Sequence, residues 1–165
     1  MPVIRAAPDF SLVNVEGKPV QLSSLRGRPV LVAFIYTGCK TACPLLTARM
    51  ARLQQKLAKA RADAVLVSVS VDPQRDDAAT LVRFAEGFGA RPGWHFLRES
   101  PTRLAPVLQA YEEWTQPLPD GEIDHPARLH LVDAQGRVRE IYSLAFFDEQ
   151  QAFFDILTLN QEQGD

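Results

Sequence analysis

Two stretches of the chain are dominated by branched and aromatic apolar residues on successive positions. They are PVLVAFIY at 29–36 and AVLVSVSVD at 64–72. Such runs are typical of strands that are buried on both faces of a sheet. GWHFL at 93–97 predicts a shorter strand. Apolar and polar residues alternate on both sides of 16–17 and of 134–136, which predicts two hairpins with glycine in the turn.

Apolar residues at helical spacing predict four helices. The four segments are 44–62, 76–90, 100–114 and 148–161. The first has an apolar stripe of Leu46, Met50, Leu53 and Leu57. Asp76 or Asp77 suits the N-terminal cap of the second helix and Asp148 that of the fourth, whereas Pro106 interrupts the third. Gly89 suits the end of the second helix.

Strands that alternate with helices, followed by a terminal hairpin, predict an α/β fold. The expected architecture is a three-layer sandwich with a mixed central sheet and an N-terminal hairpin. The chain has 165 residues, the length of one ordinary domain that folds without the help of a disulfide. We therefore assign residues 1–165 to a single domain.

Charge and composition exclude several classes of function. Lys and Arg number 18 against 20 for Asp and Glu, with no basic block, so we expect no nucleic-acid partner. The apolar run at 30–36 is far shorter than the ~20 residues of a membrane-spanning helix. The opening PVIRAAPDFSL shows no export signal, although a mature exported domain would read the same way.

The two cysteines of the chain, Cys39 and Cys43, directly follow the first predicted strand. Pro44 is favoured at the first helical position, so we expect Cys43 to be the N-cap of the helix and Cys39 to lie in the loop before it. Free backbone N–H groups and the helix dipole favour thiolates there, and Lys40 adds a positive charge. The pair could be inert, form a disulfide or bind a soft metal.

The order of strand, cysteine loop and helix is that of thioredoxin-like proteins, but three residues separate the thiols here instead of the usual two. A CxxC loop holds an exchangeable disulfide, whereas a looser CxxxC loop more readily turns both sulfurs toward one metal ion; either loop can close a disulfide. Two thiolates leave a soft ion short of donors, so such a site requires a third ligand.

Three histidines are candidates for this third ligand. His95 and His130 lie between apolar neighbours in predicted strands, which favours plain packing. His125 lies in the polar loop PDGEIDHPAR, where an imidazole is free to point at a site. The alternative for His125 is a surface histidine in a solvated loop.

Four segments, in order over nearly the whole chain, carry a family pattern. They are DFSLVNVEGKPVQLSSLRGRPVLVAFIYTGCKTACP, VSVSVDPQRDDAATLVRFAEGFG, GWHFL and DHPARLHLVDAQGRV. In these segments the chain resembles the Sco/SenC family, whose members help to deliver copper to cytochrome c oxidase. The resemblance implies a thioredoxin-like fold and copper, as Cu(I) or Cu(II), bound by Cys39, Cys43 and His125.

The resemblance also implies an exported protein of the bacterial periplasm. Its members are usually tethered to the membrane by an N-terminal segment, and neither tether nor signal is seen in this chain. Asp72 matches an acidic position near the family's site, although an Asp-Pro turn at the end of a strand is the slightly favoured explanation. The implied partner is the copper-site subunit of cytochrome c oxidase or another copper chaperone, and a monomer is the expected state.

The chain departs from the family around the thiols. Lys40 stands where a proline usually follows the first cysteine, and Thr41 where an acidic residue is common. A cation beside the thiols lowers their pKa but repels a metal ion, so we expect weaker copper binding and more prominent thiol chemistry than in typical members. Pro126 restricts the backbone of His125 to extended conformations.

The leading interpretation is a copper metallochaperone, and whether the protein is also an enzyme is left open. The alternative is a thiol-disulfide reductase acting on the cysteines of a copper-site protein, with Cys39 as the attacking thiol. The two are compatible because only the reduced pair binds copper. Zinc is weakly disfavoured because structural zinc requires four ligands. A peroxiredoxin is disfavoured because Tyr36 and Lys40 stand where it usually has Thr or Ser, and a structural role because exposed loop thiols promote aggregation.

Overall fold

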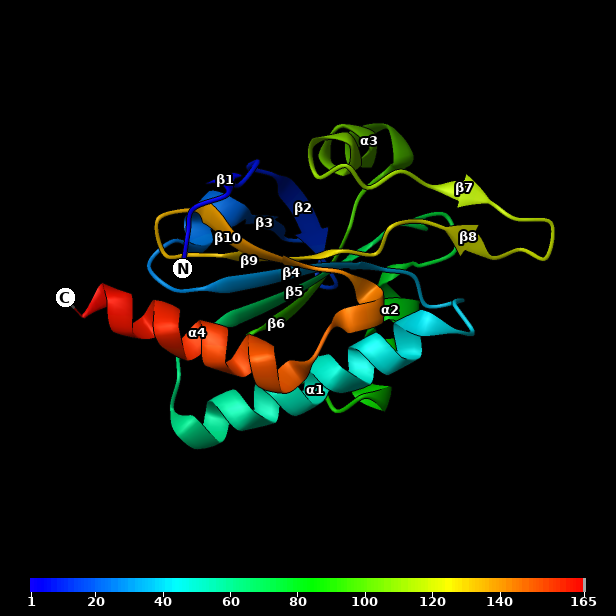
Figure 1. Ribbon diagram of the computed structural model, residues 1–165. Coiled ribbons are helices and arrows are strands. Elements are labelled where there is room, and N and C mark those ends of the chain that lie inside the picture. Colours follow the sequence, from blue (N-terminus) through cyan, green and yellow to red (C-terminus); the bar gives the residue numbers. More distant parts are fainter. Residues whose placement is uncertain (165) are drawn as a thin grey trace.

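An eight-stranded sheet runs through the middle of the computed structural model, which describes residues 1–164 (Figure 1). Its strand order is β1-β10-β9-β4-β5-β6-β2-β3. The strands are β1 Arg5–Ala6, β2 Ser11–Asn14, β3 Pro19–Gln21, β4 Val30–Ile35, β5 Val65–Ser70, β6 Trp94–Arg98, β9 Leu129–Val132 and β10 Arg137–Tyr142. Strands β4, β5 and β6 are parallel and the remaining pairs antiparallel. The predicted mixed sheet and N-terminal hairpin, β2 with β3, are thus confirmed.

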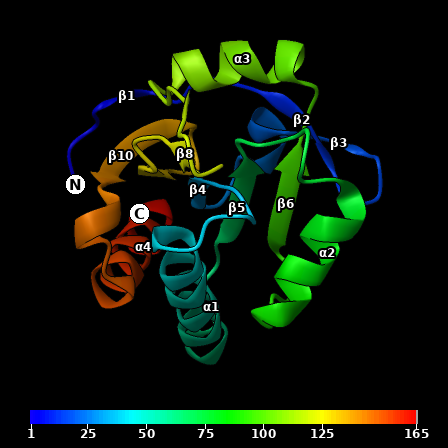
Figure 2. The same ribbon diagram turned by 90° about the vertical axis from the view of Figure 1, so that its right-hand side faces the viewer.

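Within residues 1–164 the chain forms four α-helices, which lie on both faces of the sheet. They are α1 Ala42–Ala60, α2 Ala78–Gly87, α3 Pro101–Ala110 and α4 Glu149–Gln163, with short 3-10 turns at Leu22–Leu25 and Leu144–Phe146. Helices α1 and α4 pack side by side beneath the sheet, and α3 lies above it (Figure 2). This is the expected three-layer sandwich. None of the helices in this part of the chain combines the length and the apolar character needed to cross a bilayer.

Strand β4 occupies the centre of the sheet, and all six of its residues are buried. It pairs with β5 on one side, where Leu31 lies opposite Leu66, and with β9 on the other, where Val32 lies opposite His130. Burial on both faces explains why this segment has no polar face. Because the central strand is so firmly embedded, the loop that leaves its carboxyl end starts from a fixed point.

Helix α1 buries the predicted stripe of Leu46, Met50, Leu53 and Leu57 against the sheet. Its start differs from the prediction. The helix begins at Ala42 with Thr41 as N-cap, so Cys43 is not the N-cap but lies in the first turn. Pro44 is tolerated at the third position because the first four N–H groups of a helix have no intrahelical partner to lose.

The other helices agree with the sequence in position but not at every end. Asp77 is the cap of α2, where its carboxylate accepts a hydrogen bond from the Thr80 N–H at 2.8 Å. Helix α3 contains Pro106 and ends at Ala110, four residues before the expected end. Glu112 adopts a left-handed conformation with φ of 56°, which helical backbone cannot continue through.

A small second sheet was not predicted. Strands β7 Gln116–Pro117 and β8 Ile123–Asp124 pair antiparallel. We refer to residues 116–124 as the β7–β8 hairpin. It projects from the edge of the molecule at which the amino-terminal end of α1 lies (Figure 1). His125 directly follows its second strand.

Candidate metal and thiol site

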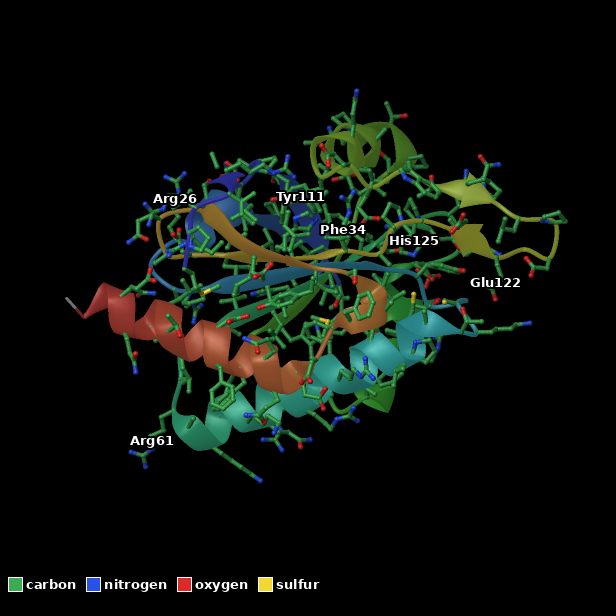
Figure 3. All side chains as sticks on the ribbon, in the orientation of Figure 1. Arg26, Phe34, Arg61, Tyr111, Glu122 and His125 are labelled. Atoms are coloured by element: carbon green, nitrogen blue, oxygen red, sulfur yellow. The ribbon has the colours of Figure 1, made fainter. Side chains whose placement is uncertain are left out.

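The site lies where the parallel strands β4 and β5 end. The thiol loop, residues 36–41, joins β4 to α1, and Asp72 and Asp76 follow β5. Because carboxyl ends of neighbouring parallel strands meet at one edge of a sheet, these two loops are close in space although they are distant in sequence. The β7–β8 hairpin approaches the same edge, and Figure 3 shows its Glu122 and the following His125 there.

The two thiols are neighbours, free and buried. The backbone N–H of Cys43 donates to Cys39 Sγ at 3.4 Å, and Thr41 Oγ1 lies 3.7 Å from the same sulfur. The exposed fractions are 8% for Cys39 and 1% for Cys43. The expectation of exposed loop cysteines is therefore wrong, because both cysteines belong to the buried hydrophobic core. Cys39 is, as expected, the more accessible of the two.

Burial and hydrogen bonding give the two thiols opposite acid strengths. Burial raises the pKa of Cys39, but hydrogen bonds from the backbone N–H groups of Cys43 and Thr41 outweigh it, and the pKa falls from 9.0 to about 7. For Cys43, burial dominates and raises the pKa to about 12. The helix start thus stabilises a thiolate, as the sequence predicts, but at Cys39 and not at Cys43.

His125 is held in a defined orientation. Its side chain is 4% exposed, and its Nδ1 lies 3.3 Å from Glu113 Oε2. Its ring packs edge-on against the ring of Tyr36, with 5.7 Å between centroids. The alternative of a solvated surface histidine is therefore wrong. A carboxylate on one ring nitrogen is the arrangement that keeps the other nitrogen available to a metal.

Glu113 organises the segment around His125 because it is buried and accepts several bonds. Its carboxylate accepts hydrogen bonds from the N–H groups of Ala127 at 3.2 Å and Arg128 at 2.8 Å. Ala127 has a φ of 53°, a conformation that is strained for a residue with a side chain. The two bonds to Glu113 compensate for this strain and fix the entry into β9.

The three predicted ligands are not gathered into one cluster. Among residues 1–164, no three His, Cys, Asp or Glu side chains lie close enough together to hold a metal ion. Cys39 and Cys43 are adjacent, whereas His125 lies against Tyr36. The donor types suit copper, since thiolates select Cu(I) and imidazole also suits Cu(II). The joint role of the three residues stays a prediction.

Asp72 forms an ion pair directed toward the hairpin. It is buried and accepts a bond from Arg75 Nε at 2.5 Å, and the same guanidinium donates to the Gly121 carbonyl at 2.9 Å. Asp72 therefore contacts the β7–β8 hairpin through Arg75. Its role beside a bound metal stays a prediction.

Asp76, a candidate helix cap, has a different place. It is buried and accepts hydrogen bonds from the Thr37 N–H at 3.1 Å, from the Thr37 hydroxyl and from the Ser70 hydroxyl at 2.7 Å. It thereby fixes the start of the thiol loop. Its position in the short connection between a buried strand and the helix cap Asp77 was the available signal.

Tyr36 and Glu122 were not identified from the sequence. The Tyr36 hydroxyl donates to Glu122 Oε2 and accepts from the Ile123 N–H at 3.0 Å. Glu122 Oε1 accepts from the Lys40 N–H at 3.3 Å. Burial and the bond to Glu122 raise the pKa of Tyr36, and the nearby Cys39 thiol raises it further. No local pattern reveals these contacts, because more than eighty residues separate the partners.

The remaining histidines are confirmed as strand residues. His95 lies half-buried in β6, and His130 is buried in β9. The His130 ring packs edge-on against Tyr111 and Phe34, at 5.0 Å and 6.1 Å between centroids. Neither histidine belongs to the thiol site.

Comparison with known proteins gives one consistent family. The sequence model of SCO1/SenC matches residues 3–159. A relative, the SCO1 protein homolog of Bacillus subtilis, is 34% identical over 139 residues, which cover 81% of this chain and 72% of that protein.

Solved structures of the same family are similar over almost their full length. A SCO1/SenC family lipoprotein from Bacillus anthracis superposes with a TM-score of 0.85 at 27% identity, covering 94% of this chain and 95% of that one. Bradyrhizobium japonicum ScoI with copper bound gives 0.80 at 28% identity, covering 93% and 99%. BsSco, a member of the Sco family of cytochrome c oxidase assembly proteins in which a disulfide switch was identified, gives 0.83 at 29% identity, covering 97% and 96%.

Proposed function

Because the chain belongs to the SCO1/SenC family, we propose that it is a copper metallochaperone for the assembly of the copper site of cytochrome c oxidase. It binds copper through Cys39, Cys43 and His125 and passes the ion by ligand exchange to the copper-site subunit or to another chaperone. The copper-bound relative supports the choice of cargo, and the family of BsSco supports the choice of recipient.

The observation that carries this proposal is the combination of two adjacent reduced thiols with an oriented imidazole. Cys39 is the first donor because its pKa of about 7 supplies thiolate near neutral pH. Cys43 follows and loses its proton on binding, so loading releases protons. Glu113 on Nδ1 of His125 leaves Nε2 for the ion. The segment after β8 moves to bring His125 to the thiols.

The cellular setting follows from the same premise. The protein acts as a monomeric single domain on the outer side of the bacterial inner membrane, exported to the periplasm and held at the membrane. The related lipoprotein from Bacillus anthracis supports a membrane-anchored form. In that compartment disulfides form readily, so the redox state of the thiol pair controls whether copper binds.

A second candidate function, thiol-disulfide reductase, is favoured by the contrast between the two thiols. The Cys39 thiolate attacks a substrate disulfide, and one substrate sulfur leaves as a thiolate. Cys43, after losing its proton, attacks Cys39 Sγ and releases the second substrate sulfur. The substrate gains two electrons, and this protein is left with a Cys39–Cys43 disulfide. The disulfide switch of BsSco is the relevant parallel.

The first test is an anaerobic titration of the fully reduced protein with Cu(I) against a competing chelator. We expect one ion per chain, loss of binding in Cys39→Ser and Cys43→Ser, and an affinity lower by more than about 10- to 100-fold in His125→Ala, because loss of a residue that only supports a ligand already costs that much. His95→Ala, whose side chain lies in β6, is the matched control and should bind normally.

The opposite result identifies the alternative. If the reduced wild type binds no copper beyond the chelator, the metallochaperone proposal fails. A measurable reduction potential together with turnover of a model disulfide would then favour the reductase.

A further inference from the structure

The β7–β8 hairpin determines the position of His125, and few contacts attach this hairpin to the rest of the molecule. Each of its strands has only two residues, and a two-stranded hairpin is marginally stable at best by itself. A hollow of about 480 Å³ lies between the hairpin and the loop after β5. Packing on that side therefore does not fix the hairpin, and its position depends on Ile123, which packs against the hydrophobic core, and on a few polar bonds.

Those bonds converge on Glu122 and Tyr36. The two oxygens of Glu122 accept from different residues of the thiol loop, the Tyr36 hydroxyl and the Lys40 N–H. The Tyr36 hydroxyl also accepts from the Ile123 N–H at 3.0 Å. Lys40 lies between the two cysteines, and Ile123 lies two positions before His125. The contact thus joins the backbone that carries the thiols to the backbone that carries the imidazole.

We propose that Glu122 and Tyr36 form a positioning tie that holds the hairpin bearing His125 against the thiol loop and so sets how readily His125 reaches copper bound by Cys39 and Cys43. The role of the tie in copper binding rests on the proposed function. Neither Glu122 nor Tyr36 is a proposed copper ligand. Figure 3 shows Glu122 at the end of the molecule where His125 lies.

Arg75 provides an attachment of the hairpin that does not involve Glu122 or Tyr36. Arg75 donates to the Gly121 carbonyl, next to Glu122, and is itself paired with Asp72. Glu113 holds the His125 ring, whose Nδ1 lies 3.3 Å from its carboxylate. Release of Glu122 leaves the hairpin attached through Arg75 and through its own ends, so the hairpin swings without unfolding. The tie therefore controls the position of His125 and not the folding of the domain.

The first arm of the test uses the reduced, metal-free protein. Hydrogen exchange of the backbone amides of residues 121–124 is compared in wild type, Glu122→Ala, Tyr36→Phe, Glu122→Gln and Asp124→Ala. Glu122→Ala removes the acceptor of the Tyr36 hydroxyl and the Lys40 N–H, and Tyr36→Phe removes the hydroxyl that bonds Glu122 and the Ile123 N–H. Both variants should raise the exchange rate of these amides at least about tenfold. Glu122→Gln keeps one acceptor oxygen for the Lys40 N–H, and its amide NH2 can donate to the Tyr36 hydroxyl, so exchange should stay within about threefold of wild type.

Asp124→Ala is the matched control for charge. Asp124 lies in the same hairpin, is exposed, and its removal changes the net charge by the same amount as Glu122→Ala. Exchange in this variant should equal that of wild type. Amides of β4 serve as an internal reference and should be unaffected in every variant.

The second arm uses the copper-loaded protein. The rate of copper release to a chelator should rise about tenfold in Glu122→Ala and Tyr36→Phe and remain unchanged in Asp124→Ala. The Cu(II) spectrum of the two affected variants should shift toward that of His125→Ala, which reports loss of the imidazole and not a general loss of stability.

Two results overturn the inference. Hairpin exchange that is unchanged in Glu122→Ala and Tyr36→Phe shows that there is no tie. Faster exchange with unchanged copper release and spectrum shows that the tie does not position the ligand. If wild type binds no copper, the proposed function fails separately, and the exchange arm alone decides whether the tie exists.

Discussion

Cys39 and Cys43 belong to the same helical start, yet the local backbone distinguishes them. Cys39 Sγ accepts the N–H of Cys43, whereas Cys43 is enclosed by the core and has an exposed fraction of 1%. Donors directed at one sulfur stabilise its negative charge, and burial of the other destabilises that charge. Cys39, whose sulfur accepts these hydrogen bonds, is thus the thiol that reacts first with an electrophile.

This contrast predicts the pH dependence of thiol alkylation in the reduced, metal-free protein. Alkylation of Cys39 should rise as pH passes through about 7, since its pKa lies there and not at 9.0, and Cys43 should stay unreactive up to high pH. Rates measured by mass spectrometry from pH 5 to 9 check this. The Cys39→Ser variant, which retains Cys43, should lose the fast reaction; fast labelling of Cys43 in that variant would contradict the assignment.

Asp76 gives a second prediction for a single residue. Replacing it with Ala leaves the N–H and hydroxyl of Thr37 and the hydroxyl of Ser70 without their acceptor. We expect Asp76→Ala to lower the free energy of unfolding by about 3 kcal/mol, measured by urea denaturation at pH 7. Among the described residues, the side chain of its neighbour Asp77 accepts a hydrogen bond only from the Thr80 N–H, so Asp77→Ala should cost less. Equal losses would argue against a special role for Asp76.

At the scale of elements, the sequence predicts what depends on local pattern. Apolar runs predict the core strands β4 and β5, and helical spacing predicts the stripe of α1. Glycine predicts the turn at Gly136, which has a φ of 83°. The start of α1 was misplaced because Pro44 is compatible with several positions of the first turn. The end of α3 and the β7–β8 hairpin depend on contacts with distant segments, which local pattern does not contain.

The candidate site follows the same rule. Cys39 and Cys43 are visible as the two cysteines of the chain, and His125 as the histidine outside the predicted strands. The residues that orient them, Glu113 and Glu122, stand in polar segments where a carboxylate is unremarkable. Their importance arises only when folding brings α3 and the hairpin to the end of β4.

Helix α4 provides a prediction at this scale. The carboxylate of Asp148 accepts from the N–H groups of Gln150 at 2.7 Å and Gln151 at 3.4 Å and so caps the helix that packs on α1. Asp148→Ala should lower the free energy of unfolding by about 1 kcal/mol, and Asp148→Ser by much less, because serine also caps. Thermal or urea unfolding of the two variants checks this; equal losses would show that the carboxylate does not act as a cap.

For the whole molecule, buried titratable groups make stability depend on pH. Burial lowers the pKa of His130 from 6.5 to about 4, helped by the positive charges of Arg5 and Arg128. Burial raises the pKa of Asp133, but hydrogen bonds from Arg137 and Arg139 outweigh this effect, so that its pKa lies below the usual value. In both cases the unfolded chain binds protons at a higher pH than the folded protein. The free energy of unfolding therefore rises with pH between the folded-state and unfolded-state pKa of each group.

We therefore expect acid to destabilise the protein in two stages. Between about pH 6.5 and 4 the free energy of unfolding should fall by about 3 kcal/mol through protonation of His130 in the unfolded chain. Below that, loss of the Asp133 interactions lowers it further. Urea unfolding of His130→Phe at pH 7, 5.5 and 4 should show the first stage removed; an unchanged pH profile would contradict this prediction.

The two ends of the described chain meet on Arg139. Its guanidinium donates to the carbonyls of Met1 and Pro2 and to Glu162 of α4, while the amino group of Met1 lies 3.3 Å from Glu162. The ends lie at one end of the molecule, and the thiol loop, cyan in Figure 1, lies at the other.

Residues near both ends of the described chain are therefore close enough to be joined into a circular chain. A short peptide could link residue 1 to residue 164, and the chain could be reopened in the exposed turn around Gly17 without cutting the sheet at β4. Such a circular permutant should keep its thiol chemistry. A reporter domain fused near residue 1 or residue 164 would also leave the thiol face free for a large partner.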